Sequence, residues 1–115
     1  MSERSDKVRL IDMIDAAQRI VDSLQDQSLE MFLEDMDKRD AVTYRLQIIG
    51  EAAYKLSDQL KKAHPSLEWL KIQGLRHKIV HDYYALDDRT IYNIGRNYVP
   101  ALMTRLTEIL ESWSE

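Results

Sequence analysis

The sequence predicts an all-α fold, an up-and-down bundle of four main helices plus one short helix. Apolar residues recur at steps of three and four through most of the 115 residues, which is the period of a helix face. Only 3 Gly and 2 Pro are present, too few for a fold with many turns. The connections between helical segments are short, so we expect a single domain over residues 1–115.

The first helix is expected to have a wide apolar face. A second stripe, formed by Ile11, Ile14 and Val21, runs beside the first, and so wide a face predicts contact with more than one neighbouring helix. The first stripe consists of Leu10, Met13, Ala17, Ile20 and Leu24. A short helix of one or two turns is expected next, over residues 29–36.

The most regular stripe predicts one long helix that continues to His64, because a residue before proline is disfavoured in the α region. Gly50 lies in the middle of this helix, where it costs about 1 kcal/mol relative to alanine. A close approach by the backbone of another helix would compensate for that cost. The stripe consists of Val42, Leu46, Ile49, Ala53, Leu56 and Leu60.

Two more helices are expected in the second half. Pro65 and Ser66 can begin the first of them, with Trp69, Ile72, Leu75 and Ile79 towards the core. Asp87 and Asp88 offer N-cap oxygens for the last helix, which Pro100 should kink or split in two. Its apolar stripe consists of Ile91, Ile94, Tyr98, Leu102, Leu106, Ile109 and Trp113. The apolar surplus of the first helix and a heptad-like stripe favour a homodimer.

Composition excludes several classes of protein. Without cysteine there is no disulfide and no thiolate ligand or nucleophile. The amino terminus lacks the apolar core of a signal peptide, and no apolar run approaches the ~18 residues of a membrane span. We therefore expect a cytoplasmic protein without membrane association. The net charge of −4 argues against a general electrostatic grip on nucleic acid, so any such contact should be local, around the basic segment 71–78.

The segment GLRHKIVHDYY, residues 74–84, gathers the chemistry-bearing side chains and allows three interpretations. The first is an ordinary helix end, where basic side chains complement the helix dipole. The second is a metal site on the His77/His81 pair, with Asp82 or His64 as further ligands. A zinc hydrolase of the familiar type has Glu after the first His, whereas this chain has Lys78, whose ammonium opposes a cation.

The third interpretation is metal-free acid–base chemistry by Arg76 and His81 with Tyr83. At about 100° per residue, a step of five turns roughly 140°, so Arg76 and His81 cannot share a face of an unbroken helix. Tyr83 can share the face of Arg76. An Arg–His site then requires either a helix that ends near Val80, which frees His81, or two copies of the chain meeting across a two-fold axis. Spacing alone leaves all three interpretations open.

The arrangement Arg76-x4-His81-x-Tyr83 resembles the R-x4-6-H motif of the HEPN superfamily, and in particular the R-x4-H-x-Y motif of HepT-like toxins. The resemblance covers nearly the full length of the chain. Two further blocks contribute to it: Ile48-Ile49-Gly50-Glu51-Ala52-Ala53, and Pro65…Trp69-x2-Ile72-x-Gly74-Leu75.

This resemblance implies a HEPN-type homodimer that acts as a metal-independent endoribonuclease and toxin, without a cofactor. Arg76 and His81 would carry the chemistry on RNA in a cleft between protomers. The implied partner is an MntA-like nucleotidyltransferase antitoxin, which silences such toxins by AMPylation of the motif tyrosine. In this chain that tyrosine is Tyr83, and Tyr84 is its neighbour.

Other polar residues receive supporting or structural assignments. His77 and Lys78 are expected to contact phosphate or solvent, and Glu51 to form an ion pair with Arg76. His64 is expected at a helix end, and the packing residues are Trp69, Tyr92 and Tyr98. Two rival interpretations remain: a non-catalytic HEPN module that binds nucleotide or a nucleotidyltransferase partner, which the acidic balance favours, and a plain structural bundle.

Overall fold

A computed structural model describes residues 2–81 and 87–113, with side chains for 6–79 and 87–113. The described part contains helices and no strand, which confirms the all-α prediction. The helices are α1 (Ser2–Leu24), α2 (Leu29–Glu34), α3 (Met36–Lys55), α4 (Asp58–Ala63), α5 (Trp69–His81), α6 (Asp88–Asn93), the π-helical turn η2 (Ile94–Tyr98) and α7 (Val99–Glu111). None of the helices in these two ranges is long and apolar enough to cross a membrane.

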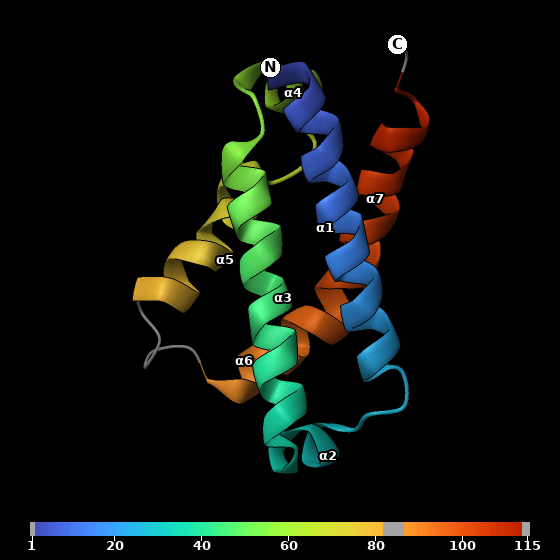
Figure 1. The fold of residues 1–115 in the computed structure, drawn as a ribbon. Coiled ribbons are helices and arrows are strands. Elements are labelled where there is room, and N and C mark those ends of the chain that lie inside the picture. The colour runs from blue at the N-terminus through green and yellow to red at the C-terminus, as the bar shows by residue number, and fades with distance from the viewer. Residues whose placement is uncertain (1, 82–86, 114–115) are drawn as a thin grey trace.

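Helix α3 lies at the centre of the arrangement, with α1 along one side and α5 along the other (Figure 1). Helix α7 packs against α1. The short helix α2 contacts α3 and α6 at the end of the bundle opposite to both termini, and α4 lies at the end with the termini (Figure 1). Helices α1, α3 and α5 therefore lie side by side, with α3 in the middle.

The first stripe of α1 forms the centre of the core, as its periodicity predicts. All five of its residues are 0–1% exposed: Leu10, Met13, Ala17, Ile20 and Leu24. The helix contacts α3, α7 and η2, so the prediction of several neighbours is confirmed. The second stripe is only partly covered, because Ile14 and Val21 pack against the core while Ile11 is 45% exposed.

The prediction of one long helix up to His64 is wrong. Helix α3 ends at Lys55, Leu56 is extended, and Ser57 caps the separate helix α4 by accepting a hydrogen bond from the Leu60 N–H at 3.1 Å. Asp6 of α1 holds this break, since its buried carboxylate accepts from the Ser57 N–H at 2.9 Å and from the Ser57 hydroxyl. A contact with the far end of the chain thus interrupts a stripe that is continuous in sequence.

Helix α5 also begins later than expected, at Trp69, because Pro65 and Ser66 form a turn. His64 is the C-cap of α4, in line with its assignment to a helix end. Its carbonyl accepts a hydrogen bond from the Trp69 indole N–H at 2.9 Å. Trp69 is 7% exposed, which confirms its assignment to the core.

The last helix is split before Pro100, as predicted, and the break has the form of the π-helical turn η2. Proline has no N–H to donate to the carbonyl four residues earlier, so the helix widens there rather than continuing in α geometry. Gly95 in η2 lies against α1, where a Cβ atom would stand 2.7 Å from Leu24 Cδ1. Arg96 closes the end of α1 by donating to the carbonyl of Leu24 at 2.8 Å.

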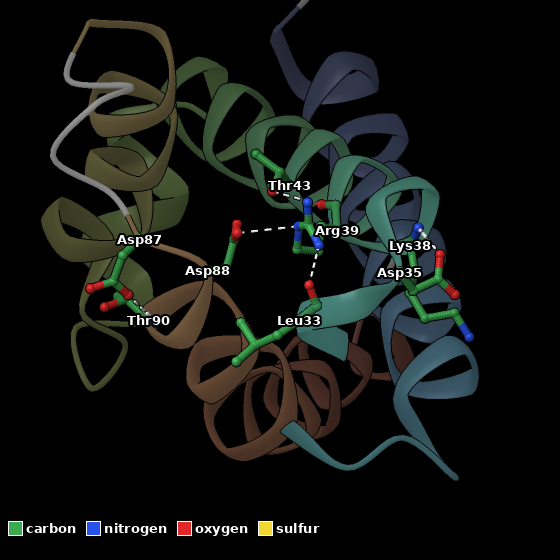
Figure 2. Close-up of polar contacts among 8 residues, drawn as sticks. All are labelled: Leu33, Asp35, Lys38, Arg39, Thr43, Asp87, Asp88 and Thr90. Carbon is green, nitrogen blue, oxygen red and sulfur yellow. Dashed lines mark hydrogen bonds and ion pairs between the residues drawn. The ribbon is translucent and has the colours of Figure 1, made fainter. Parts of the chain in front are cut away.

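Asp87 caps α6, as predicted, because its carboxylate accepts from the Thr90 N–H at 2.8 Å. That hydrogen bonding lowers the pKa of the Asp87 carboxyl below its ordinary value. The following residue, Asp88, forms an ion pair with Arg39 of α3 at 3.2 Å (Figure 2). Arg39 also donates to the carbonyl of Leu33 at the end of α2, so one guanidinium connects three helices (Figure 2).

Gly50 allows the closest contact between α3 and α5. A Cβ atom at Gly50 would stand 2.5 Å from the backbone nitrogen of Arg76 and 3.0 Å from its Cβ atom. The expected close approach of another helix is therefore confirmed. This contact places Arg76 of α5 next to Gly50 of α3.

The substitution Gly50→Ala is expected to destabilise the protein, because the new methyl group must push the backbone of α5 away from α3. The expected loss in the free energy of unfolding is about 1–3 kcal/mol, the usual cost of overpacking. Urea denaturation followed by circular dichroism measures it.

Gly74→Ala in α5 is the matched control, since a Cβ atom there would have nothing within 4 Å. Helix propensity then favours alanine, and the protein should gain up to about 1 kcal/mol. Equal effects of the two substitutions would contradict the close contact at Gly50.

Candidate functional site

Arg76 projects from α5 towards α3, at the level of Gly50. Its Nε forms an ion pair with the Glu51 carboxylate, and its guanidinium carbon lies 5.7 Å from the centre of the Tyr54 ring. Both Arg76 and Glu51 have side chains that are 36% exposed. The guanidinium is therefore held by a carboxylate and an aromatic face, while about a third of the arginine side chain remains open to solvent.

Glu51 has a second cationic neighbour on its own helix. The Lys55 Nζ lies 3.2 Å from one of its carboxylate oxygens, and Arg76 takes the other. The ion pair between Glu51 and Arg76 is the one that the sequence led us to expect.

The remaining motif residues are His81, which is the last residue of the first described range, and Tyr83, which lies beyond it. Helix α5 runs through His81, one residue past Val80. The helical backbone therefore separates Arg76 and His81 by about 7.5 Å along the axis and turns them roughly 140° apart. The side chain of His81 and the whole of Tyr83 and Tyr84 lie outside the described residues.

The two residues that follow Arg76 on α5 face solvent. His77 and Lys78 are both exposed, so each side chain is accessible to a phosphate group as well as to water. Among the described residues, no group of three or more His, Cys, Asp and Glu side chains could hold a metal ion. The ligands proposed for the metal interpretation at His81 and Asp82 lie outside those side chains.

A pocket of about 280 Å³ lies between α1 and α3, and Glu51 is one of the residues that line it. Its walls are Arg9 and Asp12 of α1 together with Tyr44, Gln47, Ile48, Glu51 and Ala52 of α3. This pocket was not predicted from the sequence. The available signal was the spacing of Tyr44, Gln47 and Glu51 at three and four residues, which places aromatic and polar side chains on one solvent-facing stripe.

The two tyrosines assigned to packing lie away from this surface. Tyr92 packs its ring 5.4 Å from that of Phe32, and its hydroxyl donates to the carbonyl of Gln27. Tyr98 packs against the core, and burial raises the pKa of its hydroxyl. Lys71 lies 5.7 Å above the Tyr98 ring. Both assignments agree with these contacts.

Known proteins that are similar to this chain are named as ribonucleases. "Probable ribonuclease HepT" of Thermococcus cleftensis is 29% identical over 107 residues, which are 93% of this chain and 97% of that protein. A "Putative RNase" of Methanocaldococcus jannaschii is 28% identical over 111 residues, covering 96% of this chain and 92% of the relative. No solved structure matches the chain significantly.

The family model described as "Ribonuclease HepT-like" matches residues 13–109. The match begins within α1 and ends within α7, and it includes Glu51, Arg76 and His81. The resemblance noted from the motif is therefore confirmed over most of the chain. This protein belongs to the HepT-like ribonuclease family.

Proposed function

We propose that the protein is a metal-independent endoribonuclease that acts as the toxin of a toxin–antitoxin pair. The observation that carries the proposal is the position of Arg76. It is held by Glu51 and Tyr54, it is partly open to solvent, and it lies five residues before His81 in a chain of the HepT-like family. Relatives that cover nearly the whole chain bear the names of ribonucleases, which supports the same activity.

Cleavage of RNA without a metal requires three groups. A base removes the proton of the 2′-OH, an acid protonates the leaving 5′-oxygen, and a cation stabilises the charge on the phosphorane. His81 suits either proton transfer, because the unperturbed pKa of histidine, about 6.5, lies near neutral pH. Arg76 suits the third role, since its guanidinium stays charged and its planar fork matches phosphate oxygens.

The contact with Glu51 orients Arg76 for that role. The ion pair is made through Nε, and we propose that the two terminal nitrogens of the guanidinium bind the phosphate. Glu51 is thus a positioning residue, and Tyr54 supports the guanidinium from its face. His77 and Lys78, exposed on the same helix, would add contacts to neighbouring phosphates.

A second copy of the chain would complete the site. One chain supplies one His81, whereas the reaction needs both a base and an acid, so two protomers meeting near the end of α5 would provide both. The helical backbone also turns Arg76 and His81 away from each other, which favours pairing Arg76 of one copy with His81 of the other. We therefore propose an active homodimer.

Tyr83 is the proposed point of control by a nucleotidyltransferase antitoxin. Two residues after His81 in the sequence, its hydroxyl would take AMP from ATP, with pyrophosphate as the leaving group. The added phosphate carries negative charge and the nucleoside adds bulk, so the modification would occupy Arg76 and exclude RNA. This proposal rests on the motif shared with HepT-like toxins.

A second candidate function is a non-catalytic subunit that binds nucleotide or a nucleotidyltransferase partner. The net charge of −4 favours it, because it weakens the general attraction of RNA. In that case the same surface around Arg76 would bind the partner or its nucleotide, and no RNA would be cut.

Arg76→Ala and His81→Ala should each lower the rate of RNA cleavage by about a hundredfold or more, since each removes a group that acts in the transition state. Cells that express either variant should grow normally. The measurements are cleavage of a labelled RNA and growth after induction. Variants as toxic as the parent would contradict the ribonuclease proposal, and a loss of cleavage in EDTA that zinc restores would favour the metal interpretation.

Glu51→Gln should lower the cleavage rate less than Arg76→Ala and leave stability nearly unchanged, because a pair that is one-third exposed contributes at most about 1 kcal/mol. The reduction should appear in kcat, with KM little altered, as expected of a group that orients Arg76. Asp15→Asn is the control, since it removes an exposed ion pair with Arg19 on α1. Equal kinetics in both variants would contradict the positioning role.

Tyr83→Phe should prevent AMPylation while leaving RNA cleavage active, whereas Tyr84→Phe should still be modified. After co-expression with a nucleotidyltransferase antitoxin, mass spectrometry of the intact protein and of its peptides measures the AMP-sized increments. Increments on Tyr84, or none on the parent protein, would contradict the assignment of Tyr83.

A further inference from the structure

The pocket between α1 and α3 shares one residue, Glu51, with the ion pair of Arg76. Glu51 contributes to both, because its carboxylate is paired with Arg76 and its side chain forms one wall of the pocket. A strand of RNA with one phosphate at Arg76 would therefore reach the pocket with a neighbouring nucleotide. At about 280 Å³, the pocket is slightly below the size of ordinary small-molecule sites, which suits a single base rather than a larger ligand.

The chemistry of the walls suits a flat, neutral, polar group. Ile48 and Ala52 provide an apolar floor that belongs to the edge of the core. Tyr44, which is 62% exposed, stands at the rim as an aromatic surface. Stacking of a base on such a ring contributes about 1–3 kcal/mol, so this rim alone can give measurable affinity.

Two side chains of α1 face the same space with opposite hydrogen-bonding character. Arg9 offers donors, and its buried Nε has no hydrogen-bond partner within the described part of the chain. Asp12, three residues later and therefore on the same face of the helix, offers acceptors. Because the Nε is shielded from solvent, the donors that can reach a ligand are the other guanidinium nitrogens of Arg9.

The balance of charge favours a base over a phosphate in this pocket. Arg9 and Asp12 offset each other, and Glu51 is already paired with two cations, so an anion would gain little there. A base with donors and acceptors on one edge matches the pair. Guanine presents two adjacent N–H groups to a carboxylate together with acceptors for an arginine, which the other bases do not combine.

We propose that this pocket binds the base of a nucleotide next to the cleaved phosphate, with a preference for guanine, and that Arg9 and Asp12 read the base while Tyr44 stacks on it. This inference rests on the proposed ribonuclease function and adds a specificity site to it. A protein partner that fills the pocket is the competing outcome of the test.

The experiment measures base preference with RNA that cannot be cut. Hexamers of 2′-O-methyl uridine, with and without one 2′-O-methyl guanosine, are titrated with the whole protein, and fluorescence anisotropy gives the affinity. The parent should bind the guanosine-containing hexamer at least about fivefold more tightly, the lower end of the discrimination from a bidentate base contact. Asp12→Asn and Arg9→Gln should abolish this preference, and Tyr44→Ala should weaken binding of both hexamers several-fold.

Matched controls lie on the same helix. Asp22→Asn and Arg19→Gln change charge in the same way at exposed positions that do not line the pocket, and both should keep the preference of the parent. Tyr44→Phe should keep the stacking that Tyr44→Ala removes. Circular dichroism spectra that match the parent confirm that each variant is folded.

The outcomes separate this inference from the function on which it rests. If the parent shows no base preference, or if Asp12→Asn and Arg9→Gln retain it, the pocket is not a base site. If those two variants instead change the number of copies in the assembly, measured by light scattering, the pocket is a protein contact and the inference is overturned. If the parent protein cuts no RNA but prefers guanosine, and both variants lack that preference, the base site stands while the ribonuclease proposal fails.

Discussion

The contact between α3 and α5 at Gly50 determines where the candidate site lies. Because Gly50 has no side chain, the backbone of Arg76 approaches α3 closely. Glu51, the residue after Gly50, can then reach the Arg76 guanidinium. Tyr54, one turn further along α3, then lies under the same group. The packing of two helices therefore also aims the arginine. The ion pair itself is about one-third exposed and adds little to stability, so its main effect is on orientation.

Helices α5 and α6, which lie on either side of residues 82–86 in the sequence, both contact α3. On one side, α5 packs on α3 at Gly50. On the other side, α6 begins with the Asp87 cap and the ion pair between Asp88 and Arg39 (Figure 2). Arginines also close helix ends where no glycine does: Arg39 donates to a carbonyl of α2, and Arg96 to one of α1. Arg39 follows Leu33 by six residues and Arg96 follows Leu24 by 72, so a local contact closes α2 and a distant one closes α1.

Periodicity and local chemistry predicted much of the fold. The buried stripe of α1, the close contact at Gly50 and the cap at Asp87 each depend on features within a few residues. The break between α3 and α4 was missed because the apolar stripe continues through it, while the Asp6 carboxylate that stabilises it is 51 residues away from Ser57. The pocket was missed for a similar reason, since its walls come from two helices whose relative position no local pattern encodes.

The acidic balance of the chain limits how it can recognise RNA. Binding through counterion release requires many phosphate contacts, and a protein with a net charge of −4 opposes most of them. The cations near the candidate site are few, and Glu51 offsets part of their charge. Affinity must then come from fitted contacts, such as a base held on Tyr44 between Arg9 and Asp12. An acidic ribonuclease with such a pocket would select its cleavage sites by the base that it holds, and its binding would depend less on salt than that of a basic nuclease.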